Sequence, residues 1–183
     1  METFEGTVLA GASFEPIRGR VVVEDGAITA VEETATESTD LILPAFVNAH
    51  THIGDSVAKD AAVGLSLEEA VVPPDSLKHR RLQATPRVEQ VAAIRRTCRQ
   101  MTATGTALFG DFREFGREGV EILNEAAGDE PVEAFVFGSD DPAVLDVADG
   151  FGASGATDES FGERRAAVRK RGKPFAIHAG EPD

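Results

Sequence analysis

The sequence predicts an α/β protein in which a parallel sheet follows a small β-rich segment. Residues 1–43 contain short strand patterns joined by turns, whereas strand and helix patterns alternate from Pro44 onward. Five strand–helix units follow Pro44, and each return to a parallel strand needs a crossover that is usually a helix. We therefore divide the chain into a β-rich segment over residues 1–43 and an α/β segment over residues 44–183.

The β-rich segment contains one clear hairpin pattern. β-Branched runs flank Asp25-Gly26, a dipeptide that favours the positive φ angles of a tight hairpin turn. Residues 32–40 are polar and lack periodicity, which predicts a loop. A further short strand over residues 41–43 ends at Pro44.

In the α/β segment, apolar runs mark the strands and capping patterns mark the helices. We expect strands near residues 45–52, 106–111, 132–137, 150–154 and 174–178. A capping box from Ser66 to Glu69 predicts a short helix within the long connection of residues 54–84. Thr85 is the expected N-cap of the next helix, which should end at Gly105. Further helices are expected near residues 116–127, 142–147 and 158–171.

Composition and charge exclude several classes of partner. The net charge of -14 repels nucleic acid and anionic lipid, so neither is an expected partner. The chain has no apolar run of the ~20 residues that cross a bilayer, and its acidic N-terminus lacks a secretory pattern, so we expect a cytoplasmic protein. A single cysteine, Cys98, excludes an internal disulfide and a cysteine-rich zinc site.

The kind of acidity suggests a hypothesis about the source. Only four lysines accompany fourteen arginines and 32 acidic residues. Acidic excess with few lysines is typical of halophilic proteins, in which salt screens the self-repulsion. The alternative is an ordinary acidic protein.

Histidines at predicted strand ends indicate a metal site. His50 and His52 follow an apolar strand at the i, i+2 spacing that points two side chains in the same direction. His178 directly follows the fifth strand, and a third imidazole would leave the open position that catalytic zinc requires. Packing or exposed histidines are the alternative, but three of the four histidines lie at strand ends.

Other polar residues are candidates for catalysis or substrate contact. Glu181 could accept a proton from a metal-activated water and deliver it to a leaving nitrogen; the alternative is a solvated acid. Asn48 should point to the same side as His50 and could support it. Asp111 ends the second strand and either contacts substrate or a ligand, or serves as a cap. His79 could contact substrate or belong to a solvated basic loop.

Two motifs resemble those of the amidohydrolase superfamily. The segment from Leu41 to His52 is similar to the apolar stretch, Pro-Gly-Phe/Leu segment and His-x-His that close its first barrel strand, with Ala45 in place of the usual glycine. The segment from His178 to Glu181 resembles the fifth-strand His-x-x-Glu of the deaminase-type branch. The resemblance covers the whole chain in order, and it implies a TIM-type (β/α)8 barrel preceded by a small β-sandwich-like segment. Residues 44–183 would supply about five of the eight barrel units.

The resemblance also implies roles for the site residues. His50, His52 and His178 would bind one divalent ion, Zn²⁺ or alternatively Fe²⁺, and Glu181 would be the general acid and base. The lack of a lysine over residues 149–155 favours one metal over two. The superfamily also uses a sixth-strand histidine and an eighth-strand aspartate. We therefore expect this chain either to be truncated or to be completed by another chain, such as a second copy in a homo-oligomer, and to be inactive or nearly so by itself.

These observations lead to three functional hypotheses. The first is hydrolytic deamination of a small amino-substituted heterocycle, such as a nucleobase or nucleoside. The second is hydrolysis of a cyclic amide or related C–N bond, which would be separated from the first by the absence of ammonia release. The third is a non-catalytic fragment that binds metal or a partner.

Overall fold

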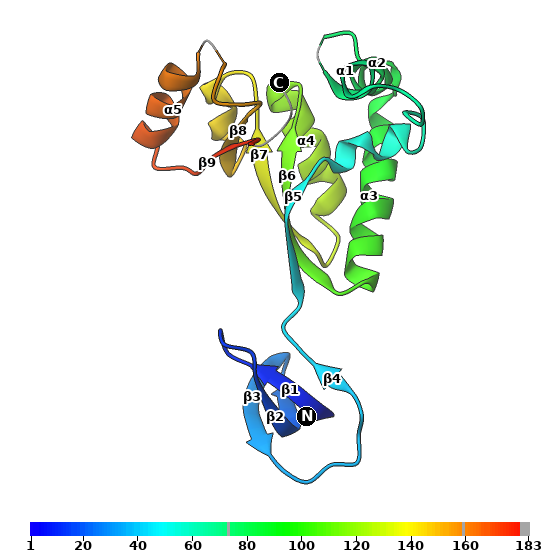
Figure 1. Cartoon of the computed structure of the whole chain (residues 1–183), viewed down its shortest axis with the longest axis vertical. Helices are drawn as coiled ribbons and strands as arrows, with labels where there is room; N and C mark the ends of the chain where they lie inside the picture. Colours follow the sequence, from blue (N-terminus) through cyan, green and yellow to red (C-terminus); the bar gives the residue numbers. More distant parts are fainter. Residues whose placement is uncertain (73, 159, 180–183) are drawn as a thin grey trace. The chain divides into compact units, whose positions relative to one another are not determined.

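The chain forms two compact units, Met1–Ala45 and Phe46–Asp183 (Figure 1). The computed structural model describes residues 1–72, 74–158 and 160–179.

The first unit is a four-stranded sheet with the strand order β3-β2-β1-β4. Its strands are β1 (Glu2–Ala10), β2 (Glu15–Glu24), β3 (Ala27–Glu33) and β4 (Leu41–Ile42). β1 pairs antiparallel with β2 and parallel with β4, and β2 pairs antiparallel with β3. Asp25 and Gly26 have φ angles of 51° and 79°, which confirms the predicted hairpin turn. The four strands form one sheet, so the sandwich arrangement is not confirmed.

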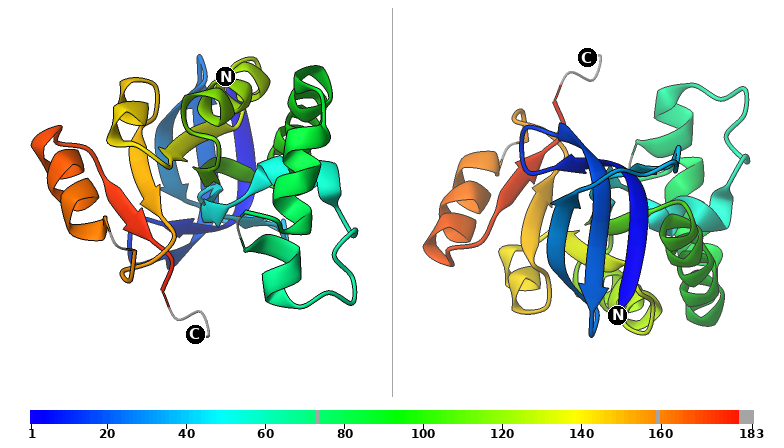
Figure 2. Two further views of the ribbon diagram at one scale, coloured as in Figure 1. Left: turned by 90° about the horizontal axis from the view of Figure 1, so that it is seen from above. Right: turned by 90° about the horizontal axis from the view of Figure 1, so that it is seen from below.

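The second unit contains one parallel sheet of five strands, in the order β5-β6-β7-β8-β9 (Figures 1 and 2). The strands are β5 (Phe46–Thr51), β6 (Thr106–Arg113), β7 (Glu133–Gly138), β8 (Gly150–Ala153) and β9 (Phe175–Ile177). Every neighbouring pair is parallel, which confirms the five predicted strands and an α/β fold with a parallel sheet.

Helices connect these strands. They are η1 (Ile53–Ala58), α1 (Leu67–Val71), α2 (Leu77–Ala84), α3 (Arg87–Ala103), α4 (Gly116–Ala127), η2 (Pro142–Asp146) and α5 (Phe161–Lys170). The predicted capping box of α1 is present: the Ser66 hydroxyl oxygen accepts from the Glu69 amide at 3.2 Å, and Glu69 Oε2 accepts from the Ser66 amide at 2.9 Å.

The prediction of Thr85 as an N-cap was wrong. Helix α2, which the sequence did not predict, ends at Ala84, and the Thr85 hydroxyl donates to the Arg81 carbonyl at 2.7 Å. Thr85 therefore terminates α2, and α3 begins at Arg87 with Pro86 as its cap residue. The physical reason is that α2 ends directly before α3 begins. The Thr85 hydroxyl can therefore bond to the Arg81 carbonyl of α2 instead of capping α3.

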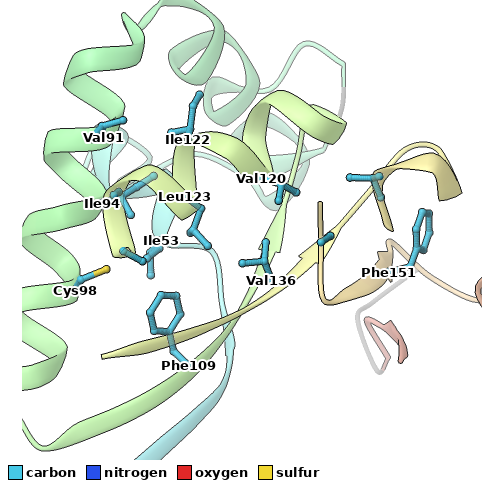
Figure 3. Close-up of a cluster of buried hydrophobic side chains, with 14 of the residues drawn as sticks. Ile53, Val91, Ile94, Cys98, Phe109, Val120, Ile122, Leu123, Val136 and Phe151 are labelled. Carbon is cyan, nitrogen blue, oxygen red and sulfur yellow. The ribbon is translucent and has the colours of Figure 1, made fainter. Parts of the chain in front are cut away.

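A hydrophobic core lies between the sheet and helices α3 and α4 (Figure 3). Ile94 and Cys98 of α3, Val120 and Leu123 of α4 and Phe109 of β6 are fully buried. Burial raises the pKa of the Cys98 thiol to about 11, and the charges of Glu130 and Asp111 add to the effect. Cys98 is therefore a protonated core residue, as its helical position predicts.

In the part of the chain that the structure describes, every helix is too short or too polar to cross a membrane.

Candidate metal centre

The three predicted ligands come together although they belong to opposite edges of the sheet. His50 is on β5, His52 follows that strand directly, and His178 follows β9. β5 and β9 are the two edge strands, with three strands between them. His50 Nε2 nevertheless lies 3.1 Å from His178 Nε2. The sheet is therefore curled, and the curl closes the site.

The geometry of the three histidines fits a single metal ion. His52 Nε2 lies 3.2 Å from His50 Nε2 and 3.1 Å from His178 Nε2. Nitrogen ligands at zinc distances of ~2.0–2.1 Å and tetrahedral angles are about 3.3 Å apart. The triangle of Nε2 atoms is thus close to the size that one ion requires, and three protein ligands leave a fourth position for water or substrate.

Acceptor oxygens lie near the other ring nitrogen of His178 and of His52. His178 Nδ1 lies 3.4 Å from the Ala153 carbonyl oxygen, and His52 Nδ1 lies 3.4 Å from Glu114 Oε1. An acceptor at Nδ1 favours the tautomer with its proton there, which leaves the Nε2 lone pair available to a metal. The Phe112 ring packs beside the cluster, with its centroid 4.6 Å from that of His50 and 4.8 Å from that of His178.

A charged group next to His52 was not predicted from the sequence. The ammonium of Lys78, on α2, contacts Glu114 Oε1 and lies 3.2 Å from Asp55 Oδ2. Burial alone would raise the pKa of Glu114, but the His52 hydrogen bond and the positive charges of Lys78 and Arg113 hold the pKa well below its usual range. Glu114 directly follows β6, so placing the strand end at Arg113 rather than Asp111 could have revealed it.

Asp111 lies inside β6, fully buried and beneath the metal-ligand segment. Its Oδ1 accepts from the Thr51 hydroxyl at 2.8 Å and from the Ile53 amide at 2.6 Å, on both sides of His52. Burial raises the pKa of Asp111 to about 6, although Arg113 and the two hydrogen bonds oppose that shift. The carboxylate thus fixes the backbone around His52.

Arg113 is buried beside Asp111, with Nη1 3.6 Å from Asp111 Oδ2. A Cβ atom on Gly54 would lie 1.8 Å from Arg113 Nη1. Only glycine at position 54 therefore leaves room for this guanidinium.

A cavity of about 320 Å³ adjoins the cluster. His52 and His178 line it, together with the aromatic side chains Phe112, Phe115 and Phe137 and the polar side chains His79, Gln83, Ser139, Asp140 and Arg164. Phe115, directly before α4, has a φ of 63°, which is an uncommon backbone conformation for a bulky residue. Arg113, Glu114 and Ser154 also line the cavity, which thus combines aromatic walls with many polar and charged groups.

His79 is a half-buried residue of α2 that lines this cavity, not part of a solvated loop. Its Nδ1 lies 2.8 Å from the Ser76 hydroxyl oxygen, and its ring packs edge-on against Phe115 at 5.9 Å. Asn48 Oδ1 accepts from the His50 amide at 3.4 Å. Glu181, the predicted proton shuttle, lies outside the described residues.

The sequence profile of the Amidohydrolase family matches residues 41–183. The chain belongs to this family.

Relatives and solved structures agree with that assignment. A protein named "Putative aminohydrolase" from Methanothermobacter thermautotrophicus is 37% identical over 96% of this chain and 53% of its own length. One of the same name from Archaeoglobus fulgidus is 34% identical over the whole chain and 54% of its own length. The crystal structure of the zinc complex of atrazine chlorohydrolase from Arthrobacter aurescens covers 100% of this chain and 53% of its own, with a TM-score of 0.72 at 15% identity. The chain therefore spans about half the length of these relatives, and its curled sheet has the fold of half an amidohydrolase barrel.

Proposed function

We propose that the chain carries the metal-binding half of a hydrolase that deaminates a small amino-substituted heterocycle. One observation carries the proposal: three histidine Nε2 atoms lie within 3.2 Å of one another beside a cavity with aromatic walls. Membership of the Amidohydrolase family, whose profile matches residues 41–183, supports hydrolysis.

His50, His52 and His178 would hold one divalent ion, with Zn²⁺ favoured by three neutral imidazoles and Fe²⁺ as the alternative. A bound ion of this kind lowers the pKa of a water molecule and so supplies a nucleophile at neutral pH. Glu181 would accept the proton of the attacking water and pass it to the leaving nitrogen, which departs as ammonia. Asn48 would support the His50 segment through the hydrogen bond to its amide.

The lining of the cavity favours a flat ring with polar substituents. Phe112 and Phe137 stack at a centroid distance of 5.0 Å and offer an apolar wall to a heterocycle. His79 would contact a polar substituent, because the Ser76 hydroxyl occupies its Nδ1 and Nε2 remains for substrate. Asp111 would act indirectly, by fixing the chain on both sides of His52.

The choice of deamination has support from another relative. The 5'-deoxyadenosine deaminase of Methanococcoides burtonii is 30% identical over 58% of this chain and 26% of its own length.

We also propose that residues 44–183 supply five units of a barrel closed by further strands, and that residues 1–43 pair into a small sandwich with strands outside the described sheet. A cytoplasmic location remains part of this proposal.

Ammonia release tests the proposed function. The complete barrel, with the strands that close residues 44–183 and loaded with Zn²⁺, is incubated with a set of amino-purines, amino-pyrimidines and their nucleosides, including 5'-deoxyadenosine, and ammonia is quantified. We expect one class of heterocycle to be deaminated, and Glu181→Gln to lower kcat by about 10²- to 10⁴-fold while zinc content stays constant. Hydrolysis of cyclic amides without ammonia, or full activity of the Glu181→Gln variant, would contradict the proposal.

A further inference from the structure

We propose that Glu114 and Lys78 are a pair of positioning residues that hold His52 in the tautomer that binds metal. This inference rests on the metal site of the proposed function. Neither residue belongs to the two histidine motifs, and they come from different elements: Glu114 follows β6, and Lys78 is on α2.

The first step of the argument is a competition at one nitrogen. His52 Nδ1 lies 3.4 Å from Glu114 Oε1 and 3.3 Å from Lys78 Nζ. A carboxylate only accepts hydrogen bonds, whereas an ammonium only donates them. Glu114 therefore favours a proton on Nδ1, and Lys78 would favour a bare Nδ1 with the proton on Nε2.

Only one of these tautomers can bind a metal through Nε2. His52 Nε2 faces the other two ligands at 3.2 and 3.1 Å, so the metal must take its lone pair. A hydrogen bond from Nδ1 to Glu114 would leave this lone pair free, while donation from Lys78 to Nδ1 would place a proton where the metal has to bind.

The other partners of Lys78 bear on this competition. Its ammonium contacts Glu114 Oε1 and also lies 3.2 Å from Asp55 Oδ2, so two carboxylates engage it. The side chain of Lys78 is only 10% exposed and that of Glu114 18%, so each charge depends on its partners rather than on water. Two of the three donors of Lys78 are thus taken by carboxylates, and the inference is that the carboxylate of Glu114, rather than the third donor 3.3 Å from Nδ1, sets the tautomer of His52.

The same pair joins the metal centre to the wall of the cavity. Lys78 precedes His79 on α2, and His79 lines the cavity that His52 and His178 also line. The contact between Lys78 and Glu114 therefore holds the β5–α3 connection at the metal ligands. Loss of either residue should displace His79 as well as loosen His52.

Zinc affinity and histidine tautomers test the inference separately from catalysis. Zinc affinity is measured by competition with a chromophoric chelator, and the tautomer of His52 by the ¹⁵N shifts of its ring in the metal-free protein. We expect Glu114→Ala to weaken zinc binding by about 10- to 100-fold and to move the His52 proton from Nδ1 to Nε2. Glu114→Gln, which keeps an acceptor oxygen, should recover part of the affinity.

A double variant makes the test specific. In Glu114→Ala/Lys78→Met the competing donor is gone, so zinc should bind more tightly than to Glu114→Ala alone. The control is Glu130→Ala, which removes another carboxylate that is only 7% exposed. Glu130 does not line the cavity, and its Oε1 lies 2.9 Å from Arg99 Nε. This control should leave zinc affinity unchanged, and circular dichroism checks that each variant is folded.

The outcomes distinguish this inference from the proposed function. If the unaltered protein does not bind zinc, the metal site itself is wrong. If it binds zinc but Glu114→Ala binds equally tightly with an unchanged His52 tautomer, the positioning role is wrong while the proposed function stands. A double variant that binds more weakly than Glu114→Ala would also overturn the competition between Glu114 and Lys78.

Discussion

The hydrophobic core and the proposed metal centre of residues 46–179 are held together by different interactions. In the core, Ile94, Val120 and Leu123 are fully buried by apolar neighbours on two helices and a sheet. At the metal centre, His50, His52 and His178 are half-buried or exposed, and charged side chains from three segments surround His52. The core should therefore determine stability, and the strand ends should determine metal binding, with little overlap between the two.

The largest expected effect is on metal binding. His178→Ala removes one of the three proposed nitrogen ligands and should weaken zinc binding by at least a hundredfold, since two imidazoles cannot complete the site. His178 is only half-buried, so the free energy of unfolding should change by less than about 1 kcal/mol in the absence of metal. Calorimetric zinc titration and urea unfolding measure the two quantities. Equal zinc affinity in the variant and the unaltered protein would contradict the assignment of His178 as a ligand.

The second effect concerns the core, where a substitution should change stability and not zinc affinity. Leu123→Ala should lower the free energy of unfolding by about 2–5 kcal/mol, because it removes a fully buried side chain and leaves a cavity. The folded fraction should bind zinc as tightly as the unaltered protein does. A loss of zinc affinity in the folded variant would show that core and site are coupled.

A third effect concerns pH and connects the two regions. Asp111 has a pKa of about 6 in the fold against a usual 3.8, so between about pH 4 and 6 the folded protein holds a proton that the unfolded chain has released. The contribution of Asp111 to stability is therefore lost as pH rises through this window, by up to about 3 kcal/mol. Asp111→Asn cannot titrate, so the stability difference between the two proteins should change over this range. Parallel pH profiles from urea unfolding would contradict the buried, ionisable state of Asp111.

The smallest effect concerns Cys98. The thiol is fully buried and its pKa is raised to about 11, so it should not react with a disulfide reagent at neutral pH until the protein unfolds. Rapid labelling of the native protein would show that α3 opens readily.

How much could be predicted from the sequence follows the same division. The five strands and most helices were predictable, because apolar runs and caps are local patterns that the core then uses. The strand-end histidines were predictable too, because the carboxyl ends of parallel strands meet at one edge of a sheet. The 3.1 Å approach of His178 to His50 and His52 across the curled sheet was not, since no local pattern specifies curvature.

The errors come from residues whose partners lie far away in the sequence. Helix α2 was missed because its two large apolar residues, Leu77 and Leu82, give only a weak helical periodicity. Lys78 and Glu114 were missed with it, since their role depends on a contact between α2 and the end of β6. The halophilic source and the cytoplasmic location stay predictions.

The most direct test of the central claim is diffraction from zinc-loaded crystals at the zinc absorption edge. The account predicts one strong anomalous peak about 2.0–2.1 Å from Nε2 of His50, His52 and His178. A peak bound through other residues, or none at this cluster despite zinc in the crystal, would contradict it.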